Sequence, residues 1–150
     1  MLLITHLAIT FFIVLLFFSS ENYFFIFLFI SLLATVLPDI DTPFSKIGKH
    51  FKILNFFTKH RGIIHSFTFF ILLSIPILIF FKEILLPFAV GYLSHLLVDC
   101  FTIQGVCLFY PLKIRIKGVF KTNGLIEKIL LVLFILMDMF LIFVKFLGIF

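Results

Sequence analysis

The amino-acid sequence predicts an all-α fold, a multi-pass helical membrane protein of about five spans with a polar site at the cytoplasmic helix ends. Hydrophobic residues make up 63% of the chain and charged residues 13%, against about 25% charged residues in an ordinary soluble domain. The hydrophobic residues form five long runs, and polar or charged segments separate them. Because 150 residues is the length of one domain, residues 1–150 are expected to form a single helical bundle.

Each of the five runs is expected to form one helix. A helix needs about 20 residues to cross the hydrocarbon core of a bilayer, so the third and fourth runs, which are shorter, could instead form a shallow hairpin. Pro76 and Pro87 lie inside these two runs and should bend their helices. The first twenty residues contain no lysine or arginine, so we expect the first run to be an anchor and not a cleaved signal peptide. In order, the runs are Leu7 to Phe18, Tyr23 to Pro38, Phe67 to Phe81, Ile84 to Val98 and Ile129 to Leu147.

The positions of the basic residues predict the orientation in the membrane. Nine of the twelve lysines and arginines lie in segments 39–66 and 101–124, and the loop at 19–22 has none. Lysine and arginine accumulate in loops that stay in the cytoplasm. We therefore expect a multi-pass protein of the inner (cell) membrane, with its N-terminus and both basic segments on the cytoplasmic side.

The two basic segments are expected to lie at the lipid surface. Thr42 and Pro43 suit the start of a helix, and the lysines that follow recur every three residues beside apolar ones, which predicts an amphipathic surface helix. Residues 112–117 alternate apolar and basic side chains, which predicts a short strand or an extended arm. The predicted partners are the lipid bilayer and an anionic lipid substrate, and no nucleic acid is expected.

A set of histidines and aspartates is predicted to meet at one face of the membrane. Each member lies where a run begins or ends, and the orientation derived from lysine and arginine alone places all of them on the cytoplasmic side. Ionisable residues in or near spans are costly and usually functional, although any one of them could instead be a helix cap. The set is His6, Asp39, Asp41, His60, His65, His95 and Asp99.

The spacing within this set suits a metal site. His95 and Asp99 are four residues apart on one helix face, and Gly91, one turn earlier, leaves room for a neighbouring helix. Asp39 and Asp41 follow a proline at a helix end, where either carboxylate could turn inward. Imidazole and carboxylate ligands without thiolate suit zinc, and also manganese or iron. We expect one or two divalent ions, most simply zinc.

Five blocks of the sequence, in order, resemble the successive blocks of the YdjM family, inner-membrane proteins grouped with metal-dependent hydrolases. The blocks cover nearly the whole chain, and the HRG-x-x-HS and HL-x-x-D elements are the most specific of them. They are THLAIT at 5–10, LPDIDTPFSKIGK at 37–49, HRGIIHS at 60–66, GYLSHLLVDCFTIQG at 91–105 and KTNGLIE at 121–127.

The resemblance implies an integral membrane hydrolase domain with a helical arrangement distantly similar to zinc-dependent phospholipases C. Ile64, Thr42 and Thr10 depart from the threonine, histidine and glycine that are usual in the family, which concerns the hydrogen bonds around the ligands more than the ligands. Asp41 would be a ligand or would support one. The implied metal ligands are His6, Asp39, His60, His65, His95 and Asp99.

The predicted reaction is hydrolysis of a phosphoester, such as a lipid phosphate, by a metal-activated water. Asp39 or Asp41 could accept the proton, and Arg61 could bind the phosphate through its fork of donors. A non-enzymatic metal-binding or regulatory membrane protein is an alternative. A metal or proton transporter is a weaker one, because few polar residues continue toward the other face of the membrane.

Overall fold

The computed structural model describes residues 1–41, 63–112 and 114–147. These residues form five α-helices and one 3-10 helix, with no β-strand among them, so the predicted all-α class is confirmed for the described part of the chain. The surface helix predicted after Thr42 lies outside the described residues. The elements are α1 (Leu3–Phe17), α2 (Phe24–Val36), η1 (Leu37–Asp41), α4 (Phe67–Phe80), α5 (Lys82–Cys100) and α6 (Leu125–Phe146).

The five α-helices coincide with the five hydrophobic runs, and local chemistry explains where several of them begin and end. The hydroxyl of Ser66 accepts a hydrogen bond from the Phe69 N–H and so caps α4. Phe81 alone separates α4 from α5, and whether this pair forms a shallow hairpin or two spans stays a prediction. Pro76 and Pro87 lie inside these helices without ending them.

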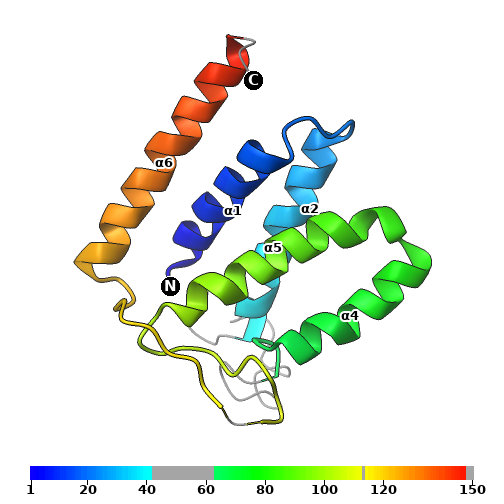
Figure 1. Ribbon diagram of the computed structural model, residues 1–150, viewed down its shortest axis with the longest axis vertical. Helices are drawn as coiled ribbons and strands as arrows, with labels where there is room; N and C mark the ends of the chain where they lie inside the picture. The colour runs from blue at the N-terminus through cyan, green and yellow to red at the C-terminus, as the bar shows by residue number, and fades with distance from the viewer. Residues whose placement is uncertain (42–62, 113, 148–150) are drawn as a thin grey trace.

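The helices pack as a bundle in which α5 is central (Figure 1). α5 packs along α2 and also contacts α1 and α4, while α6 packs against α1. The backbones of α5 and α2 approach closely at Gly91, because a Cβ atom at this position would lie 1.9 Å from the carbonyl oxygen of Ser31. Tyr92 and Leu96 of α5 form the hydrophobic core with Ala34 of α2 and Phe88.

This packing brings four helix ends together at one end of the bundle. They are the N-terminal ends of α1 and α6 and the C-terminal ends of α2 and α5. At the other end, the Lys145 ammonium of α6 donates to the Ser19 carbonyl in the turn between α1 and α2. The two ends of the bundle therefore carry different sets of residues.

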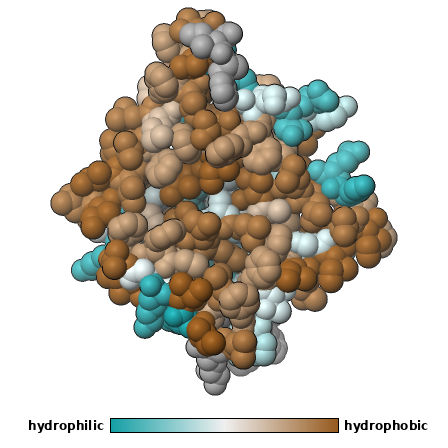
Figure 2. All heavy atoms as spheres, viewed as in Figure 1, coloured by the Kyte–Doolittle hydropathy of each residue, from teal (hydrophilic) through white to brown (hydrophobic). Residues whose placement is uncertain are grey.

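The surface is mostly hydrophobic, whereas many buried side chains are polar. Figure 2 shows apolar residues over most of the visible face, and exposed side chains such as Phe25, Ile79 and Phe140 contribute to this surface. By length and composition, α5 and α6 could cross a membrane, while the other three apolar helices have 10–17 residues. Two of the five predicted spans are therefore long enough to cross a membrane. That the other three helices also cross it stays a prediction.

The segment between α5 and α6 consists of turns and irregular backbone, with no β-strand among its described residues. It pairs at two isolated bridges, between Thr102 and Phe120 and between Val106 and Ile116. Gly105 has a φ of 60°, a backbone conformation that favours glycine, at the turn next to the second bridge. Of the two forms predicted for residues 112–117, the strand is absent from the described residues, and the extended arm stays a prediction.

Candidate metal centre

Five of the predicted histidines and aspartates meet at the end of the bundle where the four helix ends converge. His6 comes from α1, Asp39 from η1, His65 from the turn before α4, and His95 and Asp99 from α5. The three histidines and Asp99 are at most 1% exposed, while Asp39 is 19% exposed. Residues separated by almost one hundred positions in the sequence thus share one buried polar cluster.

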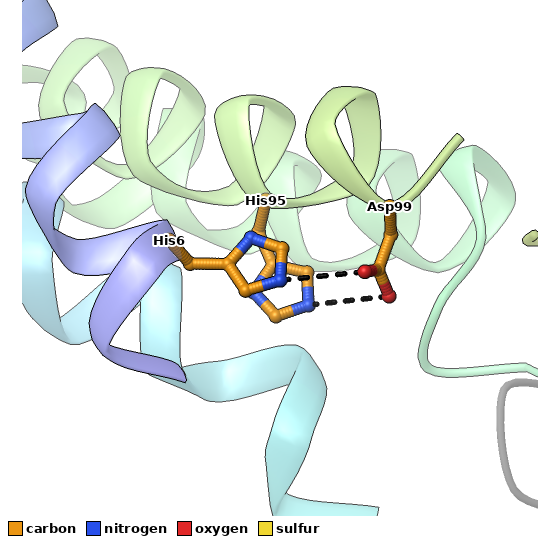
Figure 3. Close-up of side chains that lie close together, drawn as sticks. All are labelled: His6, His95 and Asp99. Carbon is orange, nitrogen blue, oxygen red and sulfur yellow. Dashed lines mark ion pairs between the residues drawn. The ribbon is translucent and has the colours of Figure 1, made fainter. Parts of the chain in front are cut away.

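His6, His95 and Asp99 form one group that could hold a metal ion (Figure 3). The Nε2 atom of His6 lies 3.3 Å from one oxygen of Asp99, and the Nε2 atom of His95 lies 3.9 Å from the other. The two imidazole rings are stacked, with ring centroids 3.9 Å apart. One ligand atom from each residue lies within 4.8 Å of the others, so the three could turn toward a common point.

Asp39, His65 and His95 form a second group of the same kind. The Nε2 atoms of His65 and His95 lie 3.6 Å and 3.9 Å from the same oxygen of Asp39. The Nε2 atom of His65 is also 4.0 Å from Asp99, so the two groups are continuous. His95 belongs to both groups and stands at the middle of the cluster.

The ring of His95 is held in one orientation by the backbone of α2. Its Nδ1 atom lies 2.8 Å from the carbonyl oxygen of Thr35, and because a carbonyl only accepts hydrogen bonds, Nδ1 must carry the proton. In the neutral ring, Nε2 then has a free lone pair. No described residue hydrogen-bonds to this buried Nε2 atom, and such a ring, fixed through its other nitrogen, is the usual arrangement of a metal-binding histidine. The donor set therefore fits a divalent ion.

A network of buried hydroxyl groups lies directly behind this histidine. The Thr35 hydroxyl donates to Thr10 at 2.9 Å, and Thr10 is 2.7 Å from the hydroxyl of Ser94. These three residues belong to α2, α1 and α5, so the network ties α2 to the two helices that carry His6, His95 and Asp99. Sequence reasoning noted Thr10 as a departure from the family pattern but missed Thr35 and Ser94, whose only signal was a hydroxyl inside an apolar run.

The turn that carries His65 is anchored to α5. The hydroxyl of Tyr92 donates a hydrogen bond to the carbonyl of Ile64, the residue before His65. Ser66, the residue after it, donates to the Ile63 carbonyl and caps α4. Tyr92 is completely buried, and no pattern in the sequence predicts its contact with Ile64.

The cluster also determines the charge of its most exposed carboxylate. Burial alone would raise the pKa of Asp39, but the close contact with the His65 ring and the electrostatic effect of His95, His65 and His6 lower it from 3.8 to about 2. Asp39 is therefore a carboxylate at neutral pH. Asp99 accepts a hydrogen bond from the Met1 amino group at 2.7 Å.

Glu127 connects α6 to this end of the bundle. It is fully buried and accepts hydrogen bonds from the backbone N–H of Leu2, the hydroxyl of Thr5 and the backbone N–H of Asn123. The contact with Asn123 caps the start of its own helix. The other two contacts hold the start of α1, one turn before His6, in place.

The structure does not describe every predicted site residue. His60 and Arg61 lie outside the described residues, and Asp41 is described only as the last backbone position of η1. Asp138, in the middle of α6, is away from the cluster. Its side chain is 7% exposed, and one of its oxygens has no hydrogen-bond partner among the described residues.

Comparison with known proteins gives one family and one named relative. A family model described as "YdjM inner membrane protein" matches residues 1–148. A protein of Bacillus subtilis (strain 168), named "Uncharacterized protein YvsG", is 30% identical over 104 residues, which are 64% of this chain and 65% of that protein. The chain thus covers slightly less than two thirds of the length of that relative. No solved structure matches the chain significantly.

Proposed function

The chain belongs to the YdjM family of inner membrane proteins, and on this premise we propose that it is a membrane-bound metal-dependent hydrolase that acts on a phosphoester such as a lipid phosphate. The observation that supports this proposal is the buried cluster of three histidines and two aspartates, arranged as two overlapping groups of metal-ligand geometry. Buried charged residues are normally paired or bind metals. This cluster lies at helix ends, where the headgroups of lipids would meet it.

The hydrogen bond to Thr35 limits how the two groups can be used. With Nδ1 of His95 occupied, only Nε2 can bind an ion, so His95 serves one group at a time. If His95 joins His6 and Asp99, the other group retains Asp39 and His65. We propose that His6, His95 and Asp99 hold one divalent ion, zinc first and manganese or iron as alternatives, and that His60 and Asp41 complete or support a second position.

Asp39 is the proposed general base. It is the most exposed member of the cluster, and it is ionised at neutral pH. Its carboxylate can therefore accept a proton from a water molecule at the edge of the site. A divalent ion bound beside it would lower the pKa of a bound water from 15.7 to about 7 and polarise the phosphoester.

The proposed substrate class follows from the location of the cluster. Lipid phosphoesters bring their headgroups to the depth at which apolar helices end, and basic residues near that depth attract anionic lipids. Arg61 follows His60 in the sequence and is proposed to bind the phosphate. The substrate would then be held by its phosphate, with its apolar chains remaining in the bilayer.

Metal analysis followed by turnover measurements tests this proposal. The full-length protein, purified in detergent, should retain about one or two equivalents of divalent metal, and it should hydrolyse a phosphatidic acid or a comparable lipid phosphoester. Chelation should abolish turnover, and the metal that restores it identifies the natural ion. Protein that holds metal but hydrolyses no phosphoester would support a non-enzymatic metal-binding role, and protein without metal affinity would contradict both readings.

A further inference from the structure

A pocket lies at the end of the bundle opposite the cluster of histidines and aspartates. It has a volume of about 780 Å³ and opens between the N-terminal ends of α2 and α5. Its floor includes Phe27 and Pro87, both buried. Pro87 precedes His95 by eight residues of helix, which is about 12 Å, so the pocket and the cluster are separate sites.

The mouth of this pocket carries charges of both signs. Glu21 comes from the turn between α1 and α2, and Lys82 and Glu83 come from the first turn of α5. All three are exposed, and none of them takes part in an ion pair among the described residues. Figure 2 shows hydrophilic residues gathered on the side of the molecule where these two turns lie. The pocket therefore combines apolar walls with one ammonium and two carboxylates that form no ion pair within the described part of the chain.

We infer that this pocket binds a zwitterionic phospholipid whose headgroup ends in a primary amine. The ammonium of Lys82 would contact the lipid phosphate, and the carboxylates of Glu21 and Glu83 would accept hydrogen bonds from the lipid amine. An acyl chain would lie on the apolar walls formed by α2 and α5. The charged residues lie where the apolar helices α2 and α5 begin. In a bilayer, the lipid headgroup would therefore lie level with the charged mouth of the pocket, and the acyl chain level with its apolar walls.

The charges select among lipid headgroups. An anionic headgroup would satisfy Lys82 but would face two uncompensated carboxylates. A quaternary choline has no N–H group to donate, so it would leave the carboxylates without hydrogen bonds, whereas a primary ammonium has three donors. The ethanolamine headgroup alone of these three supplies a partner for every charge at the mouth.

Lipid titration of the full-length protein in detergent tests this inference. Binding of phosphatidylethanolamine, phosphatidylcholine and phosphatidylglycerol with identical chains would be measured by native mass spectrometry. We expect the ethanolamine lipid to bind about tenfold more tightly than the other two, the size of effect expected for hydrogen bonds to charged groups. Equal binding of the three lipids, or a preference for phosphatidylglycerol, would overturn the inference.

Two variants and a control test the contact with the lipid amine and the contact with the lipid phosphate separately. Glu21→Gln combined with Glu83→Gln should lower the affinity for the ethanolamine lipid to that for the choline lipid. Lys82→Ala should weaken both lipids by about tenfold, whereas Lys128→Ala, which removes an exposed lysine at the other end of the bundle, should change neither. If Lys82→Ala unfolds the protein, Lys82→Met, which keeps a long unbranched side chain without the charge, decides the question. Identical behaviour of that variant and the wild type would refute the inference, and metal content, measured in parallel, should stay constant throughout.

Discussion

Replacement of Gly91 by alanine should weaken metal binding at the proposed site, although Gly91 is not one of the proposed ligands. A Cβ atom at this position would lie 1.9 Å from the Ser31 carbonyl oxygen, 2.8 Å from its carbon and 3.0 Å from the Cβ atom of Ala34. Two of these three atoms are backbone, so no side-chain rotation relieves the overlap. The ordinary range of such contacts begins at 3.4 Å, and α2 and α5 must therefore separate locally by about 1.5 Å, the difference between 3.4 and 1.9 Å.

That separation reaches the cluster one helical turn away. His95 follows Gly91 by four residues, and Thr35 follows Ser31 by four, so the 2.8 Å hydrogen bond between His95 Nδ1 and the Thr35 carbonyl spans the same gap between helices. A shift of this size would break the bond. Loss of a hydrogen bond that orients a ligand typically lowers metal affinity by about 10–100-fold, and overpacking of a core costs about 1–3 kcal/mol in stability.

Metal affinity and thermal stability, measured together in detergent, test this reasoning. Zinc affinity would be obtained by competition with a chelator of known affinity, and unfolding would be followed by circular dichroism. Leu97→Ala serves as the matched control, since Leu97 lies on α5 and is 60% exposed; its zinc affinity should equal that of the wild type. Wild-type zinc affinity and stability in Gly91→Ala would refute both the close packing of α2 on α5 and its role in orienting His95.

Three further outcomes are expected. Asp99→Asn, which removes the charge facing His6 at 3.3 Å, should lose most bound metal but retain its helical content, as metal analysis and circular dichroism would show; a metal-replete variant would exclude Asp99 as a ligand. Tyr92→Phe should lower metal affinity by about tenfold or more with little loss of stability, because it removes only the hydroxyl that holds the Ile64 carbonyl; unchanged affinity would mean that the turn is held by other contacts. Because the pKa of Asp39 is lowered from 3.8 to about 2, its ionised form stabilises the metal-free protein above pH 3.8, and that contribution is lost as the pH falls to about 2. Between pH 3.8 and about 2, the melting temperature of Asp39→Asn should therefore fall less than that of the wild type. If the two melting temperatures change with pH in the same way, the lowered pKa of Asp39 is contradicted.

The positions of the helices follow from the sequence, because each uninterrupted apolar run has one low-energy solution in which its backbone groups are satisfied internally. The boundaries were less accurate. The predicted first run started at Leu7, whereas α1 begins at Leu3 and includes His6. A hydrophobicity pattern stops at a polar side chain, but the backbone hydrogen bonds of a helix continue past it.

The pairing of His95 with Asp99 also follows from the sequence alone, because residues that are four positions apart in an α-helix lie on the same face of it. The gathering of His6, Asp39 and His65 around this pair could be expected from their positions at the helix ends, and in the structure they lie there. Whether they bind metal is what the experiments above decide.

Other features of the site depended on tertiary structure. The Thr35 carbonyl meets His95 across 60 residues of sequence, and the Tyr92 hydroxyl meets Ile64 across 28. Neither a backbone carbonyl nor a tyrosine in an apolar run carries a sequence signal for its partner. The sharing of His95 between two ligand groups likewise arises only when α1, α5, η1 and the turn before α4 are packed together. Local pattern determines which face of a helix a side chain occupies, but the atom that faces it is determined by how closely the helices approach, which here depends on the missing side chain of Gly91.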